Sequence, residues 1–297
     1  MFRSVEVMGV NRGLLSMLTV AALAVVGCGG GTGGGDGSGG GTYGGNNNGG
    51  PGYGGNTSNV LSFASNPGLG NYLVSADGRT LYYFALDVAA AAGHDPVSNC
   101  TGSCLPFWPI FHVDGPVMGA GLNASDFGDF VRPDGAKQTT FKGWPLYYFA
   151  GDTTAGDTKG DNIGEPRPTD LWFVIKDPFY SALILTKDSG PSEYLADPAG
   201  RTLYVFANDT VGTATSAPVS ACTDAACLGA WPVFAAASGT LPTALDPTKL
   251  TSFTRPDGTK QSAFDGHPLY YFAGDTKPGD TSGGGVEGFE FANPSAL

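Results

Sequence analysis

The chain has 297 residues and a formal net charge of −12 at pH 7, with 27 acidic against 15 basic residues. This balance disfavours nucleic acid as a partner, because proteins that bind it present clustered Lys and Arg. The length is typical of about two domains, and the 48 glycines predict that part of the chain does not contribute to a core.

Residues 1–27 predict a signal peptide. An apolar run of thirteen residues follows Arg3 and Arg12 and is too short to span a bilayer. The run ends just before Cys28 in a pattern that resembles the lipobox of bacterial lipoproteins, which implies a lipid on this cysteine. Met8 is an alternative start that leaves a shorter signal. We therefore expect a protein anchored by lipid in the bacterial cell envelope, periplasmic or surface-exposed, with the membrane as one partner.

Residues 28–58 predict a flexible tether. Glycine supplies 17 of the 27 residues in 29–55, and such a segment cannot bury a core. Loss of residues 1–27 removes two basic residues and one acidic residue, which leaves 13 against 26 and a net charge of −13. The mature chain is therefore expected to be acidic, tethered and without affinity for nucleic acid.

The remainder is a tandem duplication, with one copy in 59–180 and the other in 181–297. Motifs of the first copy recur in the second about 123 residues later, in the same order. The matched pairs include Arg132/Arg255, Cys104/Cys227 and Trp108/Trp231. Each copy is expected to fold in the same way.

Short aromatic and β-branched runs between Asp-Gly and Gly-Arg turns predict an all-β fold. We expect two small sandwich-like or barrel-like domains, with a propeller-like ring of four units as the alternative. Strands are predicted at 60–63, 72–75, 80–85, 108–113, 129–132, 137–141, 145–150 and 171–175, with equivalents in the second copy. Single helical turns are predicted at 123–126 and 246–248.

A Tyr-x-Phe-x-x-Asp motif occurs twice in each copy, so each copy is also interpreted as two similar halves. Strand alternation leaves both faces of such a segment apolar, which favours a buried strand over an aromatic platform for ligands. The aspartates follow the strand ends, where capping of a turn is expected. The four motifs are Tyr82/Phe84/Asp87, Tyr147/Phe149/Asp152, Tyr204/Phe206/Asp209 and Tyr270/Phe272/Asp275.

Residues 59–297 resemble the bacterial secreted-repeat lipoproteins, a family defined by a Tyr-x-aromatic-x-x-Asp motif. The resemblance rests on this motif, on the cysteine pair before Trp-Pro and on Arg-Pro-Asp-Gly, in that order and twice. It implies secretion and tandem repeats, and no known activity. The second cysteine pair is one residue wider than the first.

The cysteine pairs are interpreted as redox centres, metal ligands or structural bridges, and bridges are favoured. Neither pair has the Cys-x-x-Cys spacing, no helix signal follows to lower a thiol pKa, and even numbers of cysteines in an exported chain predict disulfides. A local bridge would stabilise the fold by roughly 2 kcal/mol. The pairs are Cys100/Cys104 and Cys222/Cys227.

One acidic loop is a candidate calcium site, because Ca²⁺ binds six to eight oxygens. Its residues are Asp152, Asp157, Asp161 and Glu165. Turn capping is the favoured alternative, since the second copy keeps only Asp275 and Asp280 of this set. Three pairs of basic residues recur with the turns and are expected to pair with aspartates or to cover aromatic rings: Arg79/Arg201, Arg132/Arg255 and Lys137/Lys260.

Catalysis is disfavoured, because none of His94, His112 and His267 recurs between the copies and no nucleophile motif is present. The leading hypothesis is a non-catalytic binding or structural module of the envelope, with an unknown envelope ligand or protein as its partner. A redox or calcium-handling protein and a carbohydrate-active enzyme are the alternatives.

Overall fold

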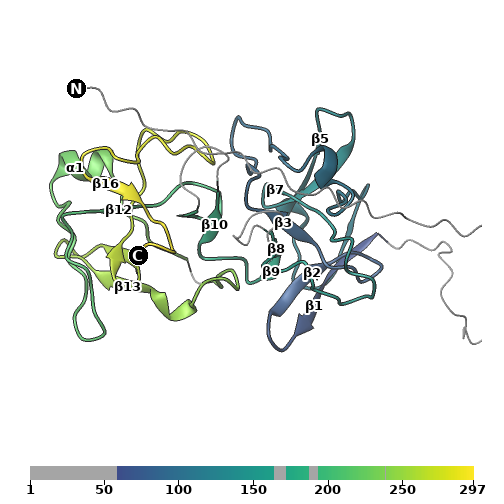
Figure 1. Ribbon diagram of the computed structural model, residues 1–297, viewed down its shortest axis with the longest axis horizontal. Coiled ribbons are helices and arrows are strands. Elements are labelled where there is room, and N and C mark those ends of the chain that lie inside the picture. Colours follow the sequence, from purple (N-terminus) through teal and green to yellow (C-terminus); the bar gives the residue numbers. More distant parts are fainter. Residues whose placement is uncertain (1–58, 164–171, 187–192, 238) are drawn as a thin grey trace, which may run out of the picture. The chain divides into compact units, whose positions relative to one another are not determined.

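The computed structural model describes residues 59–163, 172–186, 193–237 and 239–297 (Figure 1). Residues 55–297 form one compact unit. The described parts consist of short strands, one α-helix and three 3₁₀ turns, so the fold is all-β as predicted. The predicted signal peptide, Cys28 and the tether lie outside the described residues. Among the described residues, no helix is long and apolar enough to cross a membrane.

The described residues of the first copy form three small sheets. A hairpin of β1 and β2 is extended by β4, parallel to β1, and by β9, antiparallel to β2. Strand β3 pairs with β8, and β5, β6 and β7 form a meander. The strands are β1 (Val60–Asn66), β2 (Gly70–Val74), β3 (Tyr82–Phe84), β4 (Val117–Met118), β5 (Phe127–Val131), β6 (Lys137–Phe141), β7 (Trp144–Pro145), β8 (Trp172–Val174) and β9 (Lys176–Asp177).

The second copy repeats this pairing. The β10·β11 hairpin corresponds to β1·β2, the β12·β16 pair to β3·β8, and the β13–β14–β15 meander to β5–β6–β7. The strands are β10 (Leu183–Leu185), β11 (Tyr194–Ala196), β12 (Tyr204–Phe206), β13 (Leu250–Thr254), β14 (Lys260–Phe264), β15 (His267–Pro268) and β16 (Phe289–Phe291). Tandem β-rich copies are therefore present, as the internal sequence repeat predicts.

The Arg-Pro-Asp-Gly segments form the turns of the β5–β6 and β13–β14 hairpins. Gly135 and Gly258 have φ of +86° and +83°, a conformation that L side chains rarely adopt. Asp134 accepts the N–H of Ala136 at 3.1 Å and thereby fixes the turn. This chemistry explains why the motif recurs unchanged.

The predicted strand at 108–113 is not formed, because only Ile110 makes an isolated bridge there, to Tyr147. Other predicted strands are shorter in the structure: 80–85 is reduced to β3, 145–150 to β7, which ends at Pro145, and 171–175 to β8. One helix was not predicted. The predicted helical turns are present as η2 (Ala124–Asp126) and η3 (Pro247–Lys249). The first copy also has η1 (Gly102–Cys104). The helix is α1 (Ala225–Ala230), where the Asp224 carboxylate accepts the N–H of Cys227 at 2.8 Å.

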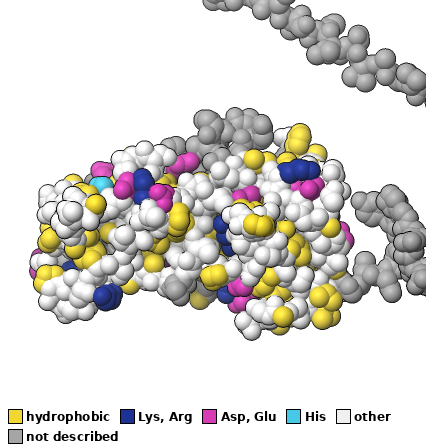
Figure 2. All heavy atoms as spheres, turned by 90° about the horizontal axis from the view of Figure 1, so that it is seen from below, with side chains coloured by type: hydrophobic (Ala, Val, Ile, Leu, Met, Phe, Trp, Pro, Cys, Tyr) yellow, Lys and Arg dark blue, Asp and Glu magenta, His cyan; other side chains and the backbone are white. Residues whose placement is uncertain are grey.

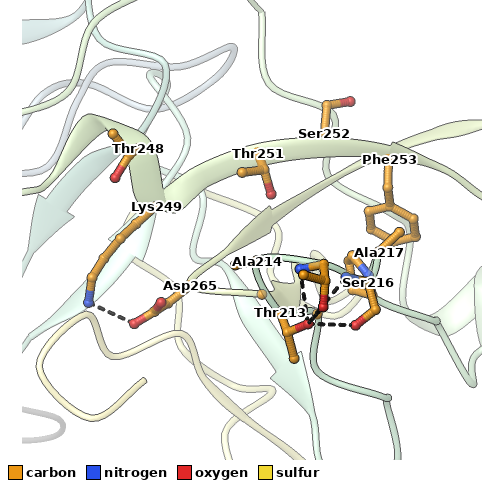
Figure 3. A pocket seen from close by; sticks show the side chains of 14 residues that line it. Thr213, Ala214, Ser216, Ala217, Thr248, Lys249, Thr251, Ser252, Phe253 and Asp265 are labelled. Atoms are coloured by element: carbon orange, nitrogen blue, oxygen red, sulfur yellow. Dashed lines mark hydrogen bonds and ion pairs between the residues drawn. The ribbon is translucent and has the colours of Figure 1, made fainter.

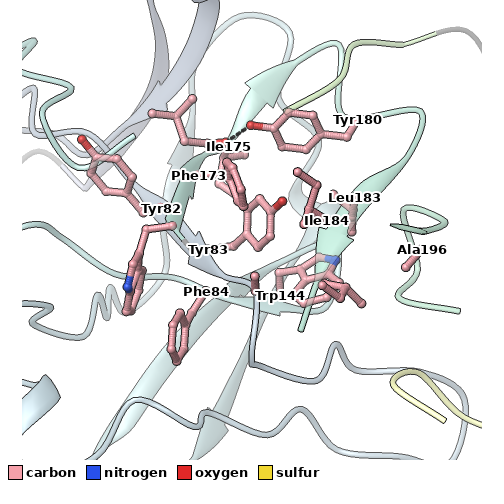
Figure 4. Close-up of a cluster of buried hydrophobic side chains, with 14 of the residues drawn as sticks. Tyr82, Tyr83, Phe84, Trp144, Phe173, Ile175, Tyr180, Leu183, Ile184 and Ala196 are labelled. Carbon is pink, nitrogen blue, oxygen red and sulfur yellow. Dashed lines mark hydrogen bonds between the residues drawn. The ribbon is translucent and has the colours of Figure 1, made fainter. Parts of the chain in front are cut away.

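The hydrophobic core continues from one copy into the other. Tyr83 and Trp144 of the first copy are fully buried, and Leu183 and Ile184 of the second copy lie in the same cluster (Figure 4). The indole N–H of Trp144 donates to the Pro198 carbonyl at 3.1 Å. On the face shown in Figure 2, Lys and Arg side chains lie apart and mostly next to acidic ones, without forming one patch.

Candidate functional site

The four motif tyrosines and aspartates pair across the two halves of each copy. The Tyr82 hydroxyl donates to Asp152 at 2.6 Å, and the Tyr147 hydroxyl donates to Asp87 at 2.7 Å. The tyrosine of each motif therefore binds the aspartate of the other motif. We call this arrangement the Tyr–Asp clasp.

The second copy contains the same clasp. Tyr204 donates to Asp275 at 2.6 Å, and Tyr270 donates to Asp209 at 2.8 Å. The other carboxylate oxygen of every motif aspartate accepts a backbone N–H further along the chain. These N–H groups belong to Asn99, Lys159, Ala221 and Ser282. The aspartates thus cap loops, as expected, and also hold the two halves together.

The backbones meet in the same reciprocal way. Tyr82 and Tyr147 exchange both of their N–H···O=C bonds, at 2.9 and 3.0 Å, and Tyr204 and Tyr270 do so at 2.9 Å. This exchange is that of a hydrogen-bonded antiparallel pair. Together with the reciprocal Tyr–Asp bonds, it joins the two halves of each copy through equivalent contacts.

Four aromatic rings stack where the two halves of the first copy meet. Trp108 and Trp172 lie face to face, with ring centroids 3.7 Å apart and an interplanar angle of 3°. Phe84 stacks on the outer face of Trp172 at 4.1 Å, and Phe149 packs on Trp108 at 4.6 Å. Each half thus supplies one phenylalanine to the tryptophan of the other half. We call these four residues the ring stack.

The second copy has a ring stack in which one tryptophan is replaced. Phe289 takes the place of Trp172 and lies 3.7 Å from Trp231 and 4.2 Å from Phe206. Phe272 completes the stack at 4.5 Å from Trp231. The stack therefore accommodates phenylalanine at this position without a change in spacing.

The motif arginine is buried in both copies. Arg132 is 2 % exposed and donates to Ser98, to the Gln138 amide oxygen at 3.0 Å and to the Cys100 carbonyl at 2.9 Å. Its Nε donates to Asp134 at 3.2 Å. Arg255 makes the equivalent bonds to Ser220, Gln261, Cys222 and Asp257. The expected pairing with aspartate is present, and the burial was not foreseen.

This network reaches the clasp through Ser98, whose hydroxyl lies 2.6 Å from the Tyr147 hydroxyl. Burial raises the pKa of Asp87 to about 8, against the lowering effects of the Asn99 N–H, the Tyr147 hydroxyl and Arg132. Burial also raises the pKa of Asp209, the equivalent residue of the second copy. These carboxyl groups therefore hold protons more strongly in the folded chain than in the unfolded one.

We expect the stability of the protein to fall as the pH rises from about 5 to 8. In that range the folded chain keeps the Asp87 proton and the unfolded chain, with a pKa of about 3.9, does not. The stabilisation is complete below pH 4 and is lost as the pH passes the folded pKa. Thermal unfolding across this range should show a smaller decline for Asp87→Asn. Asp134→Asn is the control, because its lowered pKa confines its effect to pH values below about 4.

A groove opens beside the ring stack of the first copy. It has a volume of about 700 Å³ and is lined mainly by Phe84, Phe107, Trp108, Phe149, Ile163 and Trp172. Ser103 and the disulfide-bonded Cys104 also line it. None of these residues carries a charge. Phe107 is 64 % exposed, the highest exposure among the large apolar side chains of the groove. We call this cavity the aromatic groove.

A second pocket, of about 480 Å³, lies in the second copy and is polar (Figure 3). Its charged residues are paired, because Lys249 contacts Asp265 at 2.7 Å. The first copy has this ion pair with the charges exchanged, as Asp126 and Lys142 at 3.0 Å. The hydroxyl of Thr213 also bonds to that of Ser216 at 2.8 Å within the pocket wall. Its polar groups are thus largely satisfied, and the aromatic groove is the stronger candidate for a ligand.

Both cysteine pairs form disulfides, Cys100–Cys104 and Cys222–Cys227. Cys100 and Cys222 are buried, and each offers its carbonyl to the motif arginine. The bridges therefore hold the arginine networks in place. The sequence predicted no helix next to either cysteine pair. That prediction is wrong for the second pair, because α1 contains Cys227.

The acidic loop places its carboxylates in separate bonds. Asp157 accepts the N–H groups of Thr153 and Thr154 at 3.0 Å and contacts Lys159 at 2.7 Å. Asp161 accepts Val174 N–H at 3.0 Å and the Thr243 hydroxyl at 2.7 Å. Glu165 lies outside the described residues. Among the described residues no group of three or more His, Cys, Asp or Glu could hold a metal ion, so calcium binding stays a prediction.

The other recurring basic residues lie at the surface. Arg79 covers the ring of Tyr148 and Arg201 that of Tyr271, each at 3.9 Å. Lys137 lies 3.5 Å from Asp114, whereas Lys260 donates to a threonine hydroxyl of the neighbouring strand. The covering of aromatic rings by the arginines agrees with the sequence interpretation.

Three segments of the chain match the family model of a secreted repeat of unknown function: residues 64–112, 129–176 and 251–290. These three segments are repeats of that family. The first two matches are the two halves of the first copy, and the third is the second half of the second copy. The segment around Tyr204 is unmatched, yet it forms the same clasp, so the described residues contain four structural repeats. Neither a curated protein nor a solved structure gives a significant match.

Several residues of the site were missed by sequence reasoning although they recur between the copies. Ser98/Ser220 and Gln138/Gln261 belong to the arginine networks. A Cβ on Gly160 would lie 2.8 Å from Trp108 and 2.9 Å from Tyr82, and Gly283 is equally confined. Recurrence at the same offset was the signal that would have identified them.

Proposed function

We propose that this secreted repeat protein is a lipid-anchored protein of the cell envelope whose first copy binds an apolar small molecule in the aromatic groove. Family membership supports a location outside the cytoplasm. The anchor rests on Cys28 in its lipobox-like context, and the glycine-rich tether would keep the folded copies away from the membrane surface.

The single observation that carries the binding role is the exposed Phe107 in the lining of a groove whose described side chains carry no charge. The second copy has Ala230 at the equivalent position, so the fold of a copy does not require an aromatic ring there. A cavity of about 700 Å³ lies within the range of ligand pockets, which are mostly apolar. The clasp and the buried arginine, by contrast, recur in both copies and serve the fold.

Titration of the full chain with the neutral apolar dye Nile red tests the binding role. Phe107→Ala, which installs the residue of the second copy, is expected to weaken dye binding about tenfold or more, because the apolar contact between the phenyl ring and the bound dye is lost. Val131→Ala is the matched control, since Val131 is 66 % exposed and lies outside the groove. Both variants are measured in the same buffer. Any dye that enters detergent therefore affects both titrations equally and cancels in their comparison. Equal binding by both would contradict the proposal.

Anchoring is tested separately. Cys28→Ser is expected to move the protein from the membrane fraction to the soluble fraction of cells, because the thiol that would carry the lipid is lost. Fractionation followed by mass analysis of the N-terminal peptide is the measurement. A Cys28→Ser chain that stays in the membrane fraction after a salt wash would show that another feature anchors the protein.

A further inference from the structure

The two copies of the chain meet at a junction between a turn of the second copy and a face of the first. The Trp144 indole N–H donates to the Pro198 carbonyl at 3.1 Å, and a Cβ on Gly200 would lie 3.3 Å from the same ring. Beside it, a Cβ on Gly279 would lie 3.6 Å from the Val88 side chain. The two copies are therefore in close contact here. We call residues 198–200 with 278–279 the junction turn, and Val88, Ala89 and Trp144 the junction face.

The first copy contains a turn of the same construction, but it lies at the surface. The Gly156 N–H donates to the Gly78 carbonyl at 3.0 Å, and the equivalent bond of the junction turn measures 2.9 Å. Pro278 of the junction turn is buried, whereas Ala155 at the equivalent position is exposed. Residues 76 and 77 are exposed as well. We call residues 76–78 with 155–156 the first-copy turn.

The second copy likewise contains a face of the same construction. The Gly212 N–H donates to the Gly266 carbonyl at 2.8 Å, and the equivalent bond beside the junction face measures 2.9 Å. Trp144 is fully buried in the junction, but His267 at the equivalent position is partly exposed. Val211, in the place of a fully buried alanine, is 41 % exposed. We call Thr210, Val211 and His267 the second-copy face.

We propose that the protein associates head to tail with further copies of itself. The first-copy turn of one chain docks on the second-copy face of the next chain and repeats the junction that already joins the two copies within a chain. Because the turn and the face belong to different copies, a bound chain still presents one of each. Such a heterologous contact continues from chain to chain and forms rows or rings. This inference goes beyond the aromatic groove and does not depend on it.

The residues that differ between the two pairs of surfaces complement each other in charge. In the junction, the Trp144 indole reaches the backbone of residues 198–200. The equivalent contact between chains places His267 at residues 76–78, where Asp77 replaces an alanine of the second copy. An imidazolium at this place donates its Nε2–H to the carboxylate, since Nδ1 already lies 3.1 Å from the Asp265 carbonyl. Opposite charges of this kind fix the partner and the register of a contact.

Cross-linking between two single-cysteine variants of the full chain tests the contact. Both carry Cys28→Ser, which leaves no other free thiol because the remaining four cysteines form disulfides. One variant carries Ala155→Cys and the other Thr210→Cys, so that Asp77 and His267 stay intact. A short bismaleimide is added to their mixture at physiological salt, which screens the repulsion between acidic chains. Chain pairs are expected to be about tenfold more abundant than with Val131→Cys in place of Ala155→Cys, because docking raises the effective thiol concentration.

A charge exchange between the two chains tests the register. His267→Asp on the Thr210→Cys chain places a carboxylate opposite Asp77, and pairing is expected to fall about tenfold. Asp77→Lys on the Ala155→Cys chain should restore it. This recovery comes from a substitution on the partner chain, which cannot repair a folding defect of the chain that carries His267→Asp.

Three outcomes would overturn head-to-tail association. The first is pairing no stronger than in the mixture that contains Val131→Cys. The second is equally strong pairing within the Ala155→Cys variant alone or within the Thr210→Cys variant alone, which indicates a symmetric dimer. The third is a loss of pairing on His267→Asp that Asp77→Lys does not recover. Strong pairing confined to the mixture, lost and recovered with the charges, supports the proposal.

Discussion

An Arg132→Ala chain is expected to unfold with a free energy about 3–5 kcal/mol lower than that of the native chain. The guanidinium is 2 % exposed and donates hydrogen bonds to four residues. Alanine leaves the Gln138 amide oxygen and the Cys100 carbonyl buried without this donor, and an unmet buried acceptor costs about 1–3 kcal/mol. Urea unfolding of the full chain, followed by tryptophan fluorescence, measures the loss.

Two further variants define what the arginine supplies. Arg132→Lys keeps the charge but not the planar fork that reaches several acceptors at once, so an intermediate loss is expected. Arg79→Ala is the control, because that guanidinium covers the ring of Tyr148 near the surface and should contribute less than about 1 kcal/mol. If Arg132→Ala were as stable as Arg79→Ala, the buried network would have no structural role.

The clasp is expected to show a coupling energy of about 1.5–3 kcal/mol between Tyr82 and Asp152, the range for hydrogen bonds to charged groups. The carboxylate accepts the Tyr82 hydroxyl at 2.6 Å, and both side chains are buried. A double-mutant cycle with Tyr82→Phe and Asp152→Ala, measured by urea unfolding, isolates this contact from the separate cost of each substitution.

A second cycle decides whether the contact crosses the two halves. Tyr82 and Asp87 belong to the same sequence motif but make no bond to each other, because Asp87 accepts from Tyr147. Tyr82→Phe and Asp87→Ala should therefore be additive to within about 0.5 kcal/mol. A larger coupling within one motif than between the motifs would show that the halves do not exchange partners.

The repeat architecture and the β class could be predicted because both are local properties of the sequence. Alternating apolar residues, Asp-Gly turns and the 123-residue offset each concern neighbouring or matched positions. The turns at Gly135 and Gly258 and the 3₁₀ turns η2 and η3 follow the same logic. Helix α1 was missed, because a helix of six residues gives too little periodicity to detect.

The four motifs themselves were visible, but their pairing was not. A strand pattern places Tyr82 on one face of a strand and says nothing about Asp152, which is 70 residues away. The same holds for the ring stack, in which Phe84 meets Trp172 across the strand pair β3·β8. Such contacts depend on which strands pair in space, and strand pairing is not encoded in local periodicity.

The sequence by itself therefore determined the β-rich duplication, its turns and the residue types at each site. The tertiary structure alone decided that the halves of a copy exchange tyrosines, that Arg132 is buried rather than at the surface, and that Phe107 borders a groove whose described side chains are uncharged. The physical reason is that burial and hydrogen bonding between distant residues are settled only when the chain is packed. Local sequence fixes the conformation of each segment but leaves its neighbours in space open.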